Sequence, residues 1–241
     1  GIGHCFAAGR ISYVLGLHGP CEAIDVACSS SLVASHNARR ALQIQETSIA
    51  LVAGVNMMFM ATTLDTYAQA GLTSSSGKAY VFDERANGFI RGEGCGAAVL
   101  RHRPMCTSAL SSLVGSTVRQ DGRSASLTAP SGKAQQLMLT SVVVDAGIAP
   151  AEVQVVEAAA NGSRLGDPIE VSAIMAALRR GQTSADSLPV GSLKANVGHM
   201  ESASGMAGMA KLLVSMIRSV VAPNAQLAVL AEHVATAFQG S

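Results

Sequence analysis

Aromatic and charged side chains are scarce in this sequence of 241 residues. It has no tryptophan, 3% aromatic residues, and 17 basic against 16 acidic side chains, which give a formal net charge of +1. Proteins that bind nucleic acid typically present a basic stripe or aromatic stacking platforms, so we expect no nucleic-acid partner. The charged fraction of 14% beside a hydrophobic fraction of 49% also excludes a disordered chain and predicts a core-rich globular protein.

Long apolar runs are missing as well. A membrane-spanning helix needs about 20 consecutive apolar residues, and the longest candidate, residues 48–60, is interrupted by Gly54 and Asn56. We therefore expect no membrane span. The first residues, GIGHC, resemble neither a signal peptide nor an initiator methionine, so we expect the sequence to come from the middle of a longer chain.

The cysteines follow no metal-binding or disulfide pattern. Their number is odd, and none of them forms a Cys-x-x-Cys pair. This usage is typical of reduced thiols in the cytoplasm, which is the expected location, and it implies neither a metal nor a disulfide framework. The five cysteines are Cys5, Cys21, Cys28, Cys95 and Cys106.

Strand and helix patterns alternate along the chain, which predicts a layered α/β fold with buried strands. We expect a helix after Ser29, a helix opened by Pro168, and a long functional or partner-facing loop at residues 61–91. Gly147 is a stop signal for the helix before it. The expected strands are residues 23–27, 48–55, 96–101, 112–118, 153–157 and 190–197, and further helices are expected at 133–146 and 206–217.

The most informative segment is residues 25–32, which have the sequence DVACSSSL. Here an expected strand runs into the first turn of an expected helix at Cys28. The unpaired N–H groups and partial positive charge of a helix N-terminus stabilise a thiolate, which is a capable acyl acceptor. From position alone, Cys28 is either such a nucleophile or one of five inert buried cysteines.

The sequence of this segment closely resembles the DTACSSSL active-site signature of β-ketoacyl synthases in type I modular polyketide synthases, with Val26 in place of the usual threonine. Further matches follow in family order along nearly the whole chain up to about Asn224. They are AAGRISY at 7–13, FD at 82–83, GFIRGEGCG at 88–96, QDGRS at 120–124 and LTAP at 127–130. The resemblance implies that Cys28 is the acyl-accepting nucleophile.

A second motif lies at residues 191–199, whose sequence GSLKANVGH resembles the family pattern G-S-x-K-x-N-x-G-H. The resemblance implies that His199 donates a hydrogen bond to the malonyl thioester carbonyl. It also implies that Lys194 orders the charge network behind the histidines. We expect a strand to deliver Lys194 and a turn to deliver His199 just ahead of a helix. The histidines at 4, 18, 36, 102 and 233 match no catalytic position and are expected to be structural or exposed.

The family's first catalytic histidine is missing. Residues 156–170 are VEAAANGSRLGDPIE where the family has VEAHGTGTxLGDPIE, so Ala159 occupies the histidine position without a gap. Alanine cannot donate a hydrogen bond, and removing one oxyanion donor typically costs about 10²–10³ in rate. We expect decarboxylation and condensation to be impaired, whereas acyl transfer to Cys28 survives. The side-chain amide of Asn161 is an alternative donor.

The resemblance also implies the fold and the partners. It implies a partial thiolase-like α-β-α-β-α fold in which residues 1–241 form one ketosynthase domain that lacks its N-terminal part and its extreme C-terminal segment. Substrates would arrive on the phosphopantetheine of an acyl carrier protein, with neighbouring synthase domains as further partners and no cofactor or metal bound to the chain. A homodimer is expected, with residues 48–55 as the candidate seam. An isolated fragment is expected to be a poor enzyme.

Four functions are compatible with these features. The first is an elongating ketosynthase, and the second is a non-elongating ketosynthase that only accepts and passes on acyl chains, which Ala159 favours. The third is a silent scaffold partner, which the presence of Cys28 disfavours because such partners commonly lack the cysteine. The fourth is a condensing domain of fatty-acid synthesis, which shares all of these motifs.

Overall fold

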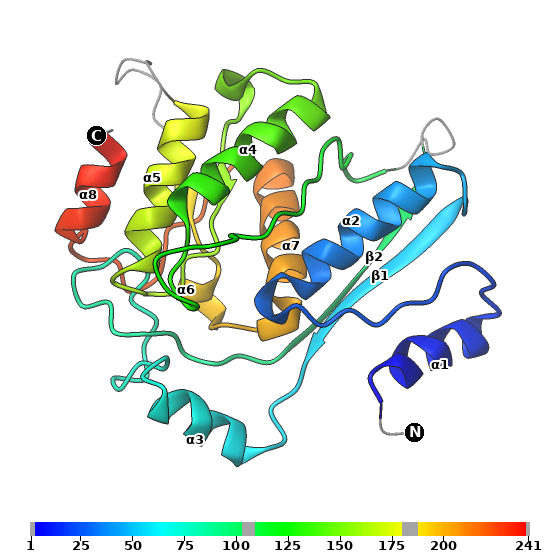
Figure 1. Cartoon of the computed structure of the whole chain (residues 1–241), viewed down its shortest axis with the longest axis horizontal. Coiled ribbons are helices and arrows are strands. Elements are labelled where there is room, and N and C mark those ends of the chain that lie inside the picture. Colours follow the sequence, from blue (N-terminus) through cyan, green and yellow to red (C-terminus); the bar gives the residue numbers. More distant parts are fainter. Residues whose placement is uncertain (1–2, 103–108, 180–187, 240–241) are drawn as a thin grey trace.

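The computed structural model describes residues 3–102, 109–179 and 188–239. Helices and two short sheets are packed together in one body, with α4, α5 and α8 gathered on one side and α2 and the long strands on the other (Figure 1). The helices are α1 (Cys5–Leu15), α2 (Ser30–Gln43), α3 (Ala61–Gln69), α4 (Gly132–Ala146), α5 (Gly166–Leu178), α6 (Lys194–Val197), α7 (Ser204–Arg218) and α8 (Glu232–Gln239).

The first sheet is an antiparallel pair of eight-residue strands, β1 (Ile49–Asn56) and β2 (Gly94–Arg101). Its register pairs Ile49 with Arg101 and Asn56 with Gly94. Helices α2 and α7 pack against it. Gly54 permits a close approach of α2, because a Cβ atom there would lie 2.9 Å from Cβ of Ser31.

Burial along β1 alternates rather than being continuous. Val52 and Asn56 are buried, whereas Ile49, Leu51 and Val55 are exposed. The expected strand at 48–55 is therefore present, but the expectation that it is buried on both faces is wrong. Period-two alternation with one covered face is the usual behaviour of an antiparallel pair.

The second sheet is a parallel pair of two-residue strands, β3 (Val156–Glu157) and β4 (Val190–Gly191). It lies beside the main apolar core, which α5 and α8 build together with the segment around Phe82. The fully buried side chains include Val81, Val171 and Val234. The two strands are short, and each is followed directly by a buried residue, Ala158 after β3 and Ser192 after β4.

Several expected elements differ from those observed. Residues 23–27 and 112–118 are not strands, because they have no ladder partner among the described residues. The expected strand at 190–197 ends at Gly191 and is followed by the helical turn α6. The expected loop at 61–91 begins with α3, and neither α1 nor α8 was expected. The expected helices at 133–146 and 206–217 are confirmed as α4 and α7.

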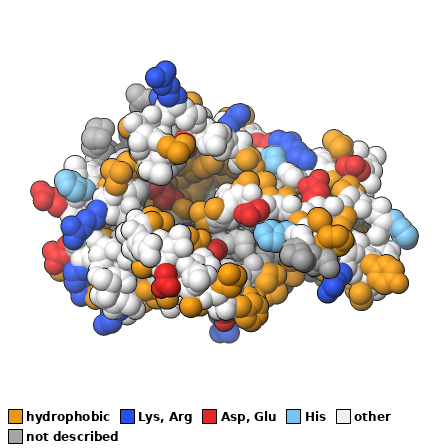
Figure 2. Space-filling model, turned by 60° about the horizontal axis from the view of Figure 1, so that its bottom comes forward, with side chains coloured by type: hydrophobic (Ala, Val, Ile, Leu, Met, Phe, Trp, Pro, Cys, Tyr) orange, Lys and Arg blue, Asp and Glu red, His pale blue; other side chains and the backbone are white. Residues whose placement is uncertain are grey.

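Many large apolar side chains remain on the surface. Figure 2 shows a hollow near the middle of one face whose walls are largely hydrophobic. Helix α1, which lies at one edge of the molecule, has no buried residue, and Tyr13 and Val14 on it are exposed. Exposed apolar surface of this extent is typical of contact sites for other protein segments. Within the described residues, no helix is both long enough and apolar enough for a bilayer crossing.

Candidate active site

Cys28 lies in a 3₁₀ turn, η1 (Ala27–Ser29), directly before α2. Its side chain is exposed, which contradicts burial of this thiol. The preceding Ala27 has φ of 53°, a left-handed conformation that costs a non-glycine residue about 1–2 kcal/mol. A strained residue held beside an accessible thiol is a common feature of functional sites.

Hydroxyl groups fix this turn. Ser29 Oγ donates to the carbonyl of Val26 at 2.9 Å, and Ser30 Oγ donates to the carbonyl of Ala27 at 2.6 Å. Ser29 is the residue before α2, but its side chain makes no cap hydrogen bond. The hydroxyls instead hold the backbone that presents Cys28, and the buried Ser31 Oγ accepts the Met206 N–H at 3.0 Å and anchors α2 to α7.

His199 is buried and held on three sides. Its backbone N–H donates to the Ile90 carbonyl at 2.7 Å, and its Nδ1 accepts the Glu201 N–H at 2.8 Å. The Phe89 ring lies 4.8 Å from the imidazole ring. Because Nδ1 is an acceptor, the proton of a neutral imidazole is on Nε2, which leaves Nε2–H as a hydrogen-bond donor.

Burial, followed by the positive charge of Lys194, lowers the pKa of His199 to about 4. The imidazole is therefore neutral at physiological pH and keeps the donor on Nε2. The ion pair between Arg91 and Glu201, at 2.7 Å, holds the segment that donates to Nδ1. This is the state that donation to a developing negative charge on a thioester oxygen requires.

A pH prediction follows from this shift. Because the pKa in the folded protein lies below the unfolded value near 6.5, the unfolded state binds more protons between about pH 4 and 6.5. The contribution of His199 to stability is present above that window and decreases as the pH falls through it. We expect the His199 imidazole NMR signals to stay at their neutral positions from pH 8 to 5. A midpoint near 6.5 would contradict the buried neutral state.

Lys194 lies on α6, not on a strand as expected, and its ammonium group donates to the carbonyl of Ala159. Burial lowers its pKa, and negative charge on Cys28 is the largest influence that opposes this shift. Since Lys194 also acts on the pKa of His199, its charge interacts with both other candidate residues. The turn η1 packs against η3 (Glu201–Ala203), which begins two residues after His199. The structure thus brings Cys28, Lys194 and His199 into one region.

Ala159 lies two residues after the end of β3, and it is exposed. Its neighbours Ala158 and Ala160 are buried in the core, with 6% and 3% of their surface exposed, whereas Ala159 is exposed. The backbone N–H of Ala159 donates to Glu170 Oε1 at 2.6 Å. The position at which the family has a histidine is therefore held by hydrogen bonds at both its N–H and its carbonyl, but it presents only a methyl group.

Buried acids without an assigned role in the sequence analysis hold this region together. Glu157 accepts the Lys211 ammonium at 2.7 Å and also accepts the backbone N–H of Leu193. Burial raises the pKa of Glu170 and of Asp167. Lys211 could have been found from the sequence, because it is a charged residue inside the apolar run at residues 206–214.

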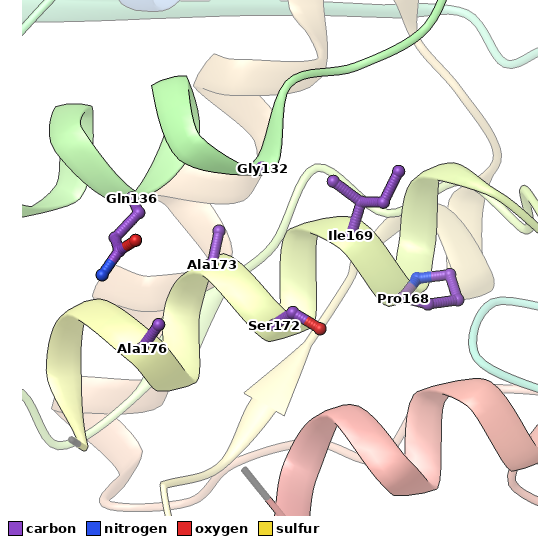
Figure 3. A pocket seen from close by; sticks show the side chains of 7 residues that line it. All are labelled: Gly132, Gln136, Pro168, Ile169, Ser172, Ala173 and Ala176. Atoms are coloured by element: carbon purple, nitrogen blue, oxygen red, sulfur yellow. The ribbon is translucent and has the colours of Figure 1, made fainter. Parts of the chain in front are cut away.

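Metal-site arrangements and cavities of the described residues also bear on what this region can bind. Among residues 3–102, 109–179 and 188–239, no group of His, Cys, Asp and Glu has the arrangement of a metal site. A cavity of about 350 Å³ between α4 and α5 (Figure 3) contains none of the predicted site residues. It is lined by Gly132, Gln136, Pro168, Ile169, Ser172, Ala173 and Ala176. Cys106 lies outside the described residues.

Two family models match consecutive parts of the chain. Residues 1–104 match the N-terminal domain of beta-ketoacyl synthase, and residues 110–228 match its C-terminal domain. Together they take in nearly the whole sequence, in the order that the motifs predicted. The match supports the thiolase-like α/β class, since the similar solved structures are ketosynthases.

The similar proteins with curated names include polyketide synthases. The chain is 40% identical over 231 residues to one component of the phenolphthiocerol/phthiocerol polyketide synthase of Mycobacterium tuberculosis, covering 94% of this chain and 12% of that protein. It is 43% identical over 228 residues to polyketide synthase GfsA of Streptomyces halstedii, covering 93% of this chain and 3% of that protein. The chain therefore spans only a small part of these relatives.

Solved structures agree with the sequence comparisons. The ketosynthase from module 6 of the bacillaene synthase of Bacillus subtilis has a TM-score of 0.92 and 36% identity, over 96% of this chain and 42% of that one. The ketosynthase domain OzmH KS7 of Streptomyces albus has a TM-score of 0.93 and 30% identity, over 97% and 41%. The chain belongs to the β-ketoacyl synthase family, among the ketosynthase domains of modular polyketide synthases.

Proposed function

We propose that this ketosynthase accepts an acyl chain from a carrier protein on Cys28 and transfers it with little or no elongation. In the acylation step the Cys28 thiolate attacks the carbonyl carbon of the thioester and forms a new C–S bond. The bond to the pantetheine sulfur breaks, and that sulfur leaves as a thiol after taking a proton. The accessible thiol on a fixed turn supports this step. The acyl group is held by the cysteine itself, so the proposal requires no cofactor and no metal.

Condensation makes a different demand on the site. Loss of CO₂ from a malonyl thioester leaves an electron pair that develops negative charge on the thioester oxygen, and hydrogen-bond donors must stabilise it. His199 supplies one donor through Nε2–H. Ala159, which aligns with the family's first histidine, supplies none, and its carbonyl and N–H are already hydrogen-bonded. This single observation favours acyl transfer over elongation.

The experiment that separates the two activities starts from the acylated protein. Full-length protein carrying an acyl group on Cys28 is mixed with a malonyl-loaded carrier protein, and both are followed by intact mass. We expect the acyl mass to stay on Cys28 or to move unchanged to a free carrier protein, without a gain of two carbons. Extension at a rate typical of related elongating ketosynthases would overturn the non-elongating assignment.

One observation keeps a slow elongating ketosynthase as the second candidate. Lys194 acts on the pKa of His199, and Glu157 is paired with Lys211, so these charged groups are in contact although residue 159 is alanine. A silent scaffold is disfavoured by the accessible Cys28. For the expected homodimer, the exposed side of β1 is the candidate seam, and a monomer of the full-length domain on sizing would count against it.

A further inference from the structure

A buried arginine lies next to the segment that carries His199. The Arg91 side chain is 8% exposed, and its Nε donates to Glu201 Oε1 at 2.7 Å. The backbones of Arg91 and His199 form a parallel β-bridge. In it the Ile90 carbonyl accepts the His199 N–H at 2.7 Å, and the His199 carbonyl accepts the Gly92 N–H at 2.9 Å. Arg91 is therefore connected to the His199 segment through its backbone as well as its side chain.

Glu201 has a strained backbone at this point. Its φ is 43°, in the left-handed region that costs a residue with a Cβ atom about 1–2 kcal/mol. Such a conformation persists only where the surrounding contacts hold it. The backbone N–H of the same residue donates to Nδ1 of His199 at 2.8 Å. Arg91 thus anchors the side chain of the strained residue whose N–H is bonded to the imidazole.

Two aromatic rings contact the same groups. The guanidinium carbon of Arg91 lies 5.4 Å from the centre of the Tyr67 ring, within the range of a cation–π interaction. The Tyr67 and Phe89 rings meet edge to face at 5.9 Å, and the Phe89 ring lies 4.8 Å from the His199 ring. The guanidinium group therefore has a carboxylate and an aromatic ring as partners, which restricts where it can hold Glu201.

The hydrogen bond at one nitrogen of a neutral imidazole decides which nitrogen carries the proton. We propose that Arg91 is a positioning residue that acts through Glu201 to keep His199 in the Nε2–H tautomer. Without the ion pair the strained residue relaxes, its N–H turns away from Nδ1, and the Nδ1–H tautomer becomes populated. The inference goes beyond the proposed function, because it concerns the state of His199 whether or not the acyl chain is extended.

The tautomer is read from the ¹⁵N chemical shifts of the His199 ring in full-length protein labelled with ¹⁵N-histidine, near neutral pH. His199→Gln identifies the signals. We expect the Nε2–H form to predominate in the unaltered protein. In Arg91→Gln the ratio of Nε2–H to Nδ1–H should fall by about two- to tenfold, the effect of one lost hydrogen bond. Arg91→Lys keeps the positive charge and should retain more of this ratio than Arg91→Gln.

The matched control is Arg39→Gln. The Arg39 side chain is 11% exposed and lies 2.7 Å from Asp145, so its ion pair resembles that of Arg91 in length and burial. Its hydrogen bonds connect α2 with α4 and with the segment before α4. We expect the tautomer ratio of His199 to be unchanged in this control.

A variant without an unpaired charge keeps the test valid if Arg91→Gln does not fold. Arg91→Gln/Glu201→Gln removes both charges of the pair, and it should show the same fall in the ratio. The inference is overturned by an unchanged ratio in the folded Arg91 variants, by an equal fall in Arg39→Gln, or by a fall in Arg91→Lys as large as in Arg91→Gln. Failure of the proposed function has a different signature, which is absent acylation of Cys28 in the unaltered protein.

Discussion

Replacing Ala159 by histidine is expected to raise the rate of condensation by about 10²–10³, because one hydrogen-bond donor to an oxyanion contributes an effect of this size. The backbone at residue 159 is already fixed, by Glu170 at its N–H and by Lys194 at its carbonyl. Its side chain is exposed rather than buried, so an imidazole can be added without overpacking the core. The measurement is the formation of the extended product from acylated protein and malonyl-loaded carrier protein.

Two controls keep this result interpretable. Ala159→Gln adds bulk and a different donor, and it should recover less activity than Ala159→His if an imidazole is needed. Asn161→Ala tests whether the side-chain amide of Asn161 supplies a donor in the natural sequence, in which case residual condensation falls further. Acylation of Cys28 should be the same in all three variants. A rate of condensation that does not respond to Ala159→His would refute residue 159 as the reason for impaired elongation.

Replacing Asp167 by alanine is expected to lower the free energy of unfolding by about 3 kcal/mol or more, because leaving one buried donor unsatisfied costs about 1–3 kcal/mol and several donors lose their acceptor at once. The Asp167 carboxylate is buried and accepts four backbone N–H groups, from Phe82, Asn161, Gly162 and Ser163. The variant would leave these donors without their acceptor in a place with little access to water. Because three of them belong to the turn after Ala159, the loss would also loosen that side of the site.

Denaturant unfolding followed by circular dichroism measures this effect. The control is Asp65→Ala, an exposed aspartate on α3, for which the free energy of unfolding should change by no more than about 0.5 kcal/mol. A loss below about 1 kcal/mol for Asp167→Ala would mean that the turn at residues 160–163 is held by other contacts.

The long helices could be predicted from the sequence because their signals are local. Helix α4 begins at the cap residue Ser131, whose side chain accepts the Ala134 N–H, and it ends at Gly147 with φ of 68°. Strands are less local, since each needs a partner. Residues 23–27 have an apolar strand pattern, but no ladder forms there among the described residues.

Lys194 shows a second limit of prediction from sequence. Its apolar neighbours predict a strand through residue 197, yet the chain forms a single helical turn in which the Lys194 carbonyl accepts the Gly198 N–H at 3.0 Å. The three predicted site residues nevertheless lie close together, since the charge of Lys194 interacts with both Cys28 and His199. The buried acids were not assigned roles because their donors come from distant segments, such as Phe82 for Asp167.

The central claim is that Cys28 is an acyl-accepting nucleophile. It is tested most directly by the intact mass of the full-length protein after incubation with an acyl-pantetheine thioester, beside a Cys28→Ala variant. We predict a gain of one acyl group that is absent from the variant and that maps to the peptide containing Cys28. The other exposed thiols, Cys5, Cys21 and Cys95, provide an internal control for unspecific acylation. No mass gain in a well-folded protein, or an equal gain in the Cys28→Ala variant, would contradict the assignment of an acyl-transferring ketosynthase.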